Sequence, residues 1–247
     1  MTYKLISDMN RKMLQSIIFT ILFISNSVLA APPKVYQFVG ADFPSILSTA
    51  QDGTLEGRAV EIIDAASKEL KFNYKISILP WVRATKMVEN GEADILIGPY
   101  KTLEREKKMK FSTNHFYEDQ IVLVTNQHTK VPWSGKLEEL KDMKLGIVRG
   151  WSLGKKFERY KQDLEVTTAD STEKLLQMLK RNRVDIIIVH QRSFKEDVKD
   201  EQIKTTNFRV LSPPLSRQKG YFSSSLINGL APFMKKFNEH IKASDQK

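Results

Sequence analysis

The chain has 247 residues, a net charge of +10 and no cysteine. The missing cysteines exclude disulfides, thiol catalysis and lipid attachment through a cysteine. Lysine and arginine alternate with glutamate and aspartate, and no basic stripe is interleaved with aromatic residues. The charge therefore indicates a solvated surface and argues against nucleic acid as a partner. This length can bury enough apolar surface for one large or two small domains.

The first 30 residues have the layout of a secretory signal peptide. A basic start precedes the uncharged, apolar stretch 13–29, and Val28-Leu29-Ala30 ends it with a small residue. We expect cleavage after Ala30 and a periplasmic protein. The alternative is a retained membrane anchor, which the polar residues inside the apolar stretch disfavour.

Amphipathic helices alternate with short apolar strands along the rest of the chain. Apolar spacing and turn residues predict helices over residues 59–70, 81–90, 137–143, 153–160, 174–181 and 231–241. Strands are expected over residues 72–79, 93–97, 145–148, 164–168 and 184–189. Asp170 and Glu173 resemble a capping box for the fifth helix. This alternation predicts an α/β fold with mostly parallel sheets flanked by helices.

One unit of helix end, turn and strand occurs twice, at residues 87–97 and 178–188. Gly91 and Asn182 occupy the same place in the two copies, and both tolerate the left-handed conformation that stops a helix. The repeat predicts two lobes of similar build, not one long sheet. Chain crossings are expected near residues 116–120 and 216–220.

The expected division of the chain follows from these crossings. It has a signal peptide over 1–30, the first segment of lobe 1 over 31–116, lobe 2 over 117–215, and a return to lobe 1 over 216–247. Folds of this kind bind ligands at the carboxyl ends of their strands, in the cleft between the lobes.

Two residues of the first half are candidates for that cleft. Arg105 follows a strand that ends at Gly98-Pro99, and a guanidinium fork fits a carboxylate with two parallel hydrogen bonds. Trp81 follows Pro80 at a strand-to-helix turn, where an indole can cover a ligand. Position alone leaves open a surface role for Arg105 and a helix staple for Trp81.

The second half supplies further candidates. Gly150-Trp151-Ser152 opens a helix, whose free N–H groups favour an anion, and Arg149 adds positive charge. Ser152 acting as an ordinary N-cap is the alternative. His190 ends a strand, and a lone histidine is more often structural than a ligand contact.

Known chemical signatures are missing from the sequence. The four histidines do not have metal-ligand spacing, and no Walker loop, GxSxG elbow or HExxH motif occurs. We therefore expect no metal, no cofactor and no catalytic activity.

The chain resembles the periplasmic solute-binding proteins of the amino-acid type, solute-binding family 3. The resemblance lies in Gly57-Arg58-Ala59-Val60-Glu61, Trp81, Gly91-Glu92-Ala93-Asp94, Thr102-Leu103-Glu104-Arg105-Glu106-Lys107-Lys108 and Phe111-Ser112. The Thr-x-Glu-Arg element is the most specific part. The resemblance implies a two-lobed, type II periplasmic binding fold that closes around a small polar ligand.

The resemblance also implies roles for particular residues. Arg105 would grip the ligand carboxylate, Tyr100 would line the same pocket and Trp81 would pack on the ligand. Gly150-Trp151-Ser152 would be the second lobe's carboxylate loop, although Trp151 stands where the family has threonine. His190 stands where the family has the aspartate that binds the ligand ammonium. The carboxylate end of the family pocket is thus kept, while its amino end is altered.

The leading hypothesis is a monomeric periplasmic binding protein that hands a small carboxylated ligand, amino-acid-like or an organic acid, to a membrane permease of an ABC transporter. A sensory or accessory binding domain of a membrane receptor is the second hypothesis. The third is a cyclohexadienyl dehydratase-like lyase on the same fold, for which Glu118, Asp119 and His190 are the candidate acids.

Overall fold

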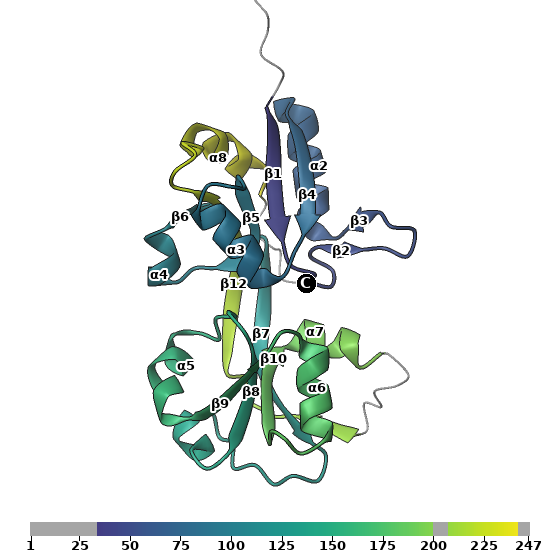
Figure 1. Ribbon diagram of the computed structural model, residues 1–247, viewed down its shortest axis with the longest axis vertical. Helices are drawn as coiled ribbons and strands as arrows, with labels where there is room; N and C mark the ends of the chain where they lie inside the picture. Colours follow the sequence, from purple (N-terminus) through teal and green to yellow (C-terminus); the bar gives the residue numbers. More distant parts are fainter. Residues whose placement is uncertain (1–33, 200–206, 242–247) are drawn as a thin grey trace, which may run out of the picture. The chain divides into compact units, whose positions relative to one another are not determined.

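The computed structural model describes residues 34–199 and 207–241 (Figure 1). The expected signal peptide lies outside these residues. From Val35 onward the chain belongs to one compact unit. No helix within the described ranges is long and apolar enough to cross a membrane.

The element bounds are as follows. The strands are β1 (Val35–Gly40), β2 (Ser48–Thr49), β3 (Leu55–Glu56), β4 (Asn73–Ile78), β5 (Ile95–Tyr100), β6 (Met109–Phe111), β7 (Tyr117–Asn126), β8 (Lys144–Val148), β9 (Glu165–Ala169), β10 (Ile186–His190), β11 (Phe208–Val210) and β12 (Ser216–Ser225). The helices are α2 (Arg58–Leu70), α3 (Trp81–Glu89), α4 (Leu103–Glu106), α5 (Lys155–Tyr160), α6 (Thr172–Lys180), α7 (Gln191–Asp197) and α8 (Ala231–Phe237). Short 3-10 helices are η1 (Leu137–Leu140), η2 (Lys161–Asp163) and η4 (Asn238–His240).

The strands fall into two parallel groups. In the first lobe, β1 pairs in parallel with β4 and with β5. In the second lobe, β8 pairs in parallel with β9 and with β10. Figure 1 shows each group with its own helices, α2, α3 and α8 beside the first and α5, α6 and α7 beside the second. The prediction of parallel sheets flanked by helices is confirmed.

Two long strands connect the lobes. Residues 222–224 of β12 pair with β5, whereas residues 216–220 of the same strand pair with β7. The later residues of β7 pair with β10. The hydrogen-bonded order is therefore continuous, β4-β1-β5-β12-β7-β10-β8-β9. Two similar lobes are present, but the expectation that they do not form one long sheet is wrong, because β7 and β12 are long enough to join the strands of both lobes in one hydrogen-bonded sheet.

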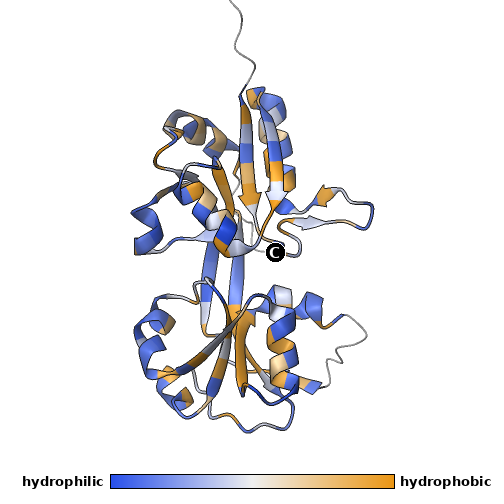
Figure 2. Ribbon diagram, in the orientation of Figure 1, coloured by the Kyte–Doolittle hydropathy of each residue, from blue (hydrophilic) through white to orange (hydrophobic). Residues whose placement is uncertain are grey.

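The crossing strands differ in polarity from the lobes that they join. Figure 2 shows β8 and β10 with apolar residues and the crossing parts of β7 and β12 in hydrophilic colours. The central strands β5 and β10 are buried along their whole length. The main hydrophobic cluster nevertheless contains residues of both lobes, such as Phe38 and Phe157, and Ile121 of β7, so apolar packing continues across the crossing.

The final helix packs on the first lobe. The ring of Phe237 in α8 lies 5.8 Å from that of Phe38 in β1, and Phe233 stacks on Tyr36 at 4.0 Å. All of these rings are in the main hydrophobic cluster or packed against it. The last segment of the described chain thus returns to the strands that begin it.

The helix-stop conformation predicted from the sequence is found at both copies of the repeat, whereas two predicted helix starts differ from the structure. Gly91 and Asn182 both have the left-handed backbone expected of them, with φ of 76° and 52°. The predicted capping box is wrong, because the hydroxyl of Ser171, not Asp170, accepts from the N–H of Lys174. The helix expected from residue 153 begins at Lys155, after Gly154.

Candidate functional site

Most of the expected site residues line one small cavity where strands of both lobes end. Tyr100 and His190 are the last residues of β5 and β10. Trp81 begins α3, and Trp151 and Ser152 follow β8. The cavity is lined by Trp81, Gly98, Tyr100, Arg105, Trp151, Ser152 and His190. The carboxyl ends of the strands therefore bring these side chains together, as the topology requires.

Arg149 is the one expected site residue that lies elsewhere. Its side chain is 61% exposed, and its guanidinium is 3.6 Å from the carboxylate of Asp170. It borders a separate surface hollow between β9 and α6. A larger hollow of about 540 Å³, beside α5 and β9, contains none of the expected site residues.

Local contacts hold Arg105 in the cavity wall. The hydroxyl of Thr102 caps α4 and accepts from the backbone N–H of Arg105 at 3.2 Å. The guanidinium donates through Nη1 to the carbonyl of Tyr100 at 3.0 Å and through Nη2 to the carbonyl of Gly150 at 3.1 Å. Burial lowers the pKa of Arg105 from its ordinary value. Within the described ranges, no carboxylate forms an ion pair with this cation.

Trp81 and Arg105 reach the same atom of the second lobe. The indole Nε1 of Trp81 donates to the carbonyl of Gly150 at 3.1 Å. The Arg105 guanidinium also lies over the Trp81 ring, 5.4 Å from its centre. One peptide group after β8 is therefore held by two side chains of the first lobe, and the lobes are in contact.

Aromatic rings fill much of the space beside these contacts. Trp151 stacks on His190 with 3.8 Å between ring centres and 15° between planes. Phe43 lies beside this pair, 5.9 Å from Trp151 and 5.6 Å from His190, and meets Trp81 edge-on at 5.9 Å. The cavity that remains is about 10 Å³, which is room for about one water molecule. A larger ligand requires the carbonyl of Gly150 to move away from Trp81 and Arg105.

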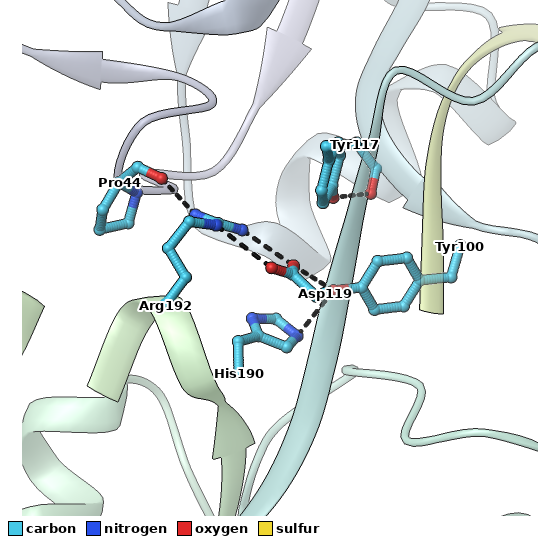
Figure 3. Close-up of polar contacts among 7 residues, drawn as sticks. Pro44, Tyr100, Tyr117, Asp119, His190 and Arg192 are labelled. Carbon is cyan, nitrogen blue, oxygen red and sulfur yellow. Dashed lines mark hydrogen bonds and ion pairs between the residues drawn. The ribbon is translucent and has the colours of Figure 1, made fainter. Parts of the chain in front are cut away.

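A buried chain of hydrogen bonds holds Tyr100 and His190, two residues of the cavity wall, in place (Figure 3). Tyr100 donates its hydroxyl proton to Oδ2 of Asp119 at 2.7 Å, and the same oxygen of Tyr100 lies 3.0 Å from Nε2 of His190. Arg192 binds both carboxylate oxygens of Asp119, at 2.8 and 3.1 Å. Arg192 also donates to the carbonyl of Pro44 in the first lobe.

Burial fixes the protonation states of the hydrogen-bonded residues Tyr100 and His190 at neutral pH. Burial, together with the nearby Tyr117 and Asp119, raises the pKa of Tyr100 well above its ordinary value, so its hydroxyl stays protonated. Burial lowers the pKa of His190 to about 4, although the charge of Asp119 opposes this shift. The wall of the cavity therefore contains a neutral imidazole beside a phenol that donates to a carboxylate.

Gly98 of the cavity wall leaves room for the ring of Tyr117 to pack against it. Tyr117 donates its hydroxyl to the carbonyl of Gly98 at 2.6 Å. Gly98 has a φ of 86°, and a Cβ there would lie 2.9 Å from the Tyr117 hydroxyl oxygen. Only glycine combines this backbone with so close a contact.

Sequence analysis did not identify Phe43, Tyr117 or Arg192 as site residues, and it named Asp119 only as a candidate acid. A signal for Asp119 was present, because Tyr117, Asp119 and Ile121 alternate along one face of β7 and all three are buried. The pairing of Asp119 with Arg192 spans 73 residues and has no local signal. No group of three or more histidine, aspartate or glutamate side chains in the described part of the chain could hold a metal ion.

Comparison with known proteins shows which family this chain is similar to. Residues 38–152 match the bacterial extracellular solute-binding proteins, family 3. The predicted resemblance is confirmed. A relative is the probable histidine-binding protein of Neisseria gonorrhoeae, which is 33% identical over 123 residues. That match covers 49% of this chain and 45% of the relative, so the chain spans less than half the length of the curated solute-binding relative.

Solved structures establish the fold. A histidine kinase sensor domain with similarity to periplasmic binding proteins superposes with a TM-score of 0.73 at 17% identity, covering 85% of this chain and 89% of that one. An ancestral arginine-binding protein bound to arginine gives 0.71 at 21% identity, covering 84% and 90%. Holo ArgBP from T. maritima gives 0.70 at 18% identity, covering 84% and 88%. The chain has the two-lobed, type II periplasmic binding protein fold.

Proposed function

We propose that this family 3 protein captures a small carboxylated ligand between its lobes in the periplasm and passes it to the permease of an ABC transporter. The first lobe would comprise residues 31–116 and 216–247, and the second residues 117–215. The ligand site would consist of Trp81, Tyr100, Arg105, Trp151, Ser152 and His190. Arg149, which is exposed and beside Asp170, is left out of it.

The state of Arg105 is the observation that carries this proposal. It is a partly buried cation whose fork ends on two neutral carbonyl groups. A ligand carboxylate can accept two charge-assisted hydrogen bonds from the same fork. Deleting one side of such a pair costs roughly 2–5 kcal/mol, so Arg105 is a sufficient anchor for a small anion.

Relatives support a ligand of this class. The curated relative is described as a probable histidine-binding protein, and one of the compared structures is an arginine-binding protein bound to arginine. Histidine and arginine share an α-carboxylate and an α-ammonium and differ in their side chains. Arg105 can bind the carboxylate, so we propose the carboxylate as the group that this chain recognises and assign the rest of the ligand to the second lobe.

A sensor role is the second candidate. The histidine kinase sensor domain superposes on 85% of this chain with a TM-score of 0.73. Capture of a carboxylated ligand would be the same in both cases, and only the membrane partner would differ. Finding a permease gene and an ATPase gene beside this gene would support transport, whereas finding a sensor kinase gene there would support sensing.

A lyase activity is disfavoured by the placement of the acids. Asp119 accepts from Arg192 and Tyr100, and Glu118 lies 3.2 Å from Arg217 at the crossing strands. Neither carboxylic acid is among the residues that line the cavity. The third candidate, His190, does line it, but burial lowers its pKa to about 4, so at neutral pH it is not a charged acid. Turnover of prephenate or arogenate by the purified protein would contradict a purely binding function.

Two arginine variants test the proposal. A thermal-shift screen over amino acids and organic acids should find a carboxylate that raises the melting temperature, because a ligand that binds only the folded state stabilises it. Calorimetry with that compound should show at least about a tenfold weaker affinity for Arg105→Ala. Arg149→Ala is the matched control and should bind as the parent does. Equal affinities of the parent and Arg105→Ala would contradict the proposal.

A further inference from the structure

Four side chains form one hydrogen-bonded line from α7 to the cavity, namely Arg192, Asp119, Tyr100 and His190 (Figure 3). We infer that this line fixes His190 as a hydrogen-bond acceptor, and that the site thereby selects carboxylates with an uncharged donor group over α-amino acids with an ammonium. The 2-hydroxy acids are the simplest such ligands. The inference rests on the proposed function, since it deepens the assignment of the same cavity.

The direction of the hydrogen bonds follows from the first member of the line. Arg192 can only donate, and it donates to both oxygens of Asp119. An ionised carboxylate can only accept, so the single proton of Tyr100 goes to Asp119. The Tyr100 oxygen, 3.0 Å from Nε2 of His190, is then an acceptor. His190 must therefore carry its proton on Nε2.

A neutral imidazole with its proton on Nε2 has a lone pair on Nδ1. That atom is buried and has no hydrogen-bond partner among the residues that the structure describes. The ring is held in place by stacking on Trp151 at 3.8 Å and by the bond from Nε2 to Tyr100. Rotation of the ring would break that bond. Nδ1 is thus an acceptor of fixed orientation that is buried while the lobes are closed, and since His190 lines the cavity, a ligand that separates the lobes can donate to it.

The charges around the cavity decide which donor suits this acceptor. Arg105 supplies one positive charge at the wall, and Arg192 offsets the negative charge of Asp119 by direct contact. The lining residues, Trp81, Gly98, Tyr100, Arg105, Trp151, Ser152 and His190, contain no carboxylate. A ligand ammonium would lose water without gaining an opposite charge, whereas a hydroxyl or amide N–H needs only the lone pair of Nδ1.

The tautomer can be measured without a ligand. The ¹⁵N shifts of the imidazole nitrogens of His190, assigned by comparison with His190→Asn, should report a proton on Nε2 throughout the neutral pH range. Tyr100→Phe removes the acceptor oxygen and should abolish this strict preference. A proton on Nδ1 in the parent protein would overturn the inference, whatever the protein binds.

Matched ligands test the selectivity. The probes are 3-phenyllactate, phenylalanine and 3-phenylpropionate, which carry a hydroxyl, an ammonium and a hydrogen at the α-carbon. A second set has an imidazole ring in place of the phenyl ring in each of the three acids. We expect the hydroxy acid to bind about tenfold more tightly than the other two members of its set, the effect of one satisfied hydrogen bond. His190→Asp should reverse the preference towards the amino acid. His128→Asp, at an exposed position, is the matched control and should not.

The outcomes separate this inference from the proposed function. If the amino acid binds most tightly to the parent and Arg105→Ala weakens it, the carboxylate site is real and the inference about His190 is wrong. If no acid of either set binds, or Arg105→Ala has no effect on binding, the proposed function fails. Preference for the hydroxy acid that survives in His190→Asp would also overturn the role of His190.

Discussion

Arg192 and Asp119 form a bidentate ion pair at the crossing between the lobes. Nη2 of Arg192 lies 2.8 Å from Oδ2 of Asp119, and Nε lies 3.1 Å from Oδ1. Asp119 lies in the crossing part of β7 and its side chain is 3% exposed, whereas Arg192 belongs to α7 of the second lobe. Because Arg192 also donates to Pro44 in the first lobe, one side chain contacts both lobes and the strand between them.

This pair should be important for stability. Removing one partner of a buried ion pair leaves an uncompensated charge and costs about 3–5 kcal/mol. We expect Arg192→Met to lower the free energy of unfolding towards that range, and the double variant Arg192→Met/Asp119→Asn to recover part of the loss. Urea unfolding of the parent, the two single variants and the double variant measures the coupling. Additive losses would show that the two residues stabilise the protein independently.

The buried histidine should make stability depend on pH. The folded-state pKa of His190 is about 4, against an ordinary value of 6.5. Between these values the unfolded chain binds a proton that the folded protein does not, so stability falls as the pH is lowered from 6.5 to 4. The shift corresponds to a loss on the order of 3 kcal/mol, since one pKa unit is about 1.4 kcal/mol.

The comparison with His190→Asn isolates this contribution. Asp197 acts in the opposite direction, because its pKa is raised to about 6 by burial and by neighbouring acids, so its deprotonation opposes folding as the pH rises. The parent and His190→Asn share that effect. Their difference in unfolding free energy, measured from pH 7 to 4, should therefore shrink as the pH falls. A difference that is constant over this range would mean that His190 protonates freely in the folded protein.

The sequence predicted five strands, β4, β5, β8, β9 and β10, and the helices α2, α3, α5, α6 and α8, because their signals are local. It did not predict β1, α4, α7 or the shortest strands. The repeated turn at Gly91 and Asn182 indicated two similar lobes. Ligand sites in such folds gather at the ends of strands, and the family resemblance implied pocket roles for the positions of Arg105 and His190, which are far apart in sequence. Both residues line the cavity.

Other features of the site depend on contacts that no local pattern encodes. Arg192 lies two residues after His190, yet its partner Asp119 is 73 residues away. Stacking of Trp151 on His190 depends on how the β8 loop meets the end of β10. The cap of α6 is a local contact between Ser171 and Lys174, whereas the ion pair of Asp170 with Arg149 joins the helix to the loop after β8.

A glycine in β12 should be irreplaceable. A Cβ at Gly220 would overlap the ring of Tyr117, which is buried and hydrogen-bonded to Gly98. Overpacking of this kind costs roughly 1–3 kcal/mol or more. We expect Gly220→Ala to lower the melting temperature and to weaken ligand binding, because Tyr117 supports the cavity wall. Lys219→Ala, at the exposed neighbouring position, is the control and should match the parent. Unchanged melting of Gly220→Ala would mean that the Tyr117 ring can move without loss.

Ligand entry should require the lobes to separate. The cavity holds only about 10 Å³ while the carbonyl of Gly150 is bound by Trp81 and Arg105 at 3.1 Å each. Those two hydrogen bonds favour the closed arrangement, and a ligand must bring its own contacts to both lobes to keep the protein closed around it.

Trp81→Phe removes one of the bonds but keeps an aromatic ring at the position, so it should shift the ligand-free protein towards an open form. In X-ray scattering we expect a larger radius of gyration for ligand-free Trp81→Phe than for the ligand-free parent, and a decrease for Trp81→Phe when a saturating carboxylate is added. Arg83→Ala, at an exposed position of the same helix, controls for a general effect on the helix. If the parent and Trp81→Phe have the same radius with and without ligand, the contact at Gly150 does not control closure, and a ligand must enter by movement of side chains within closed lobes.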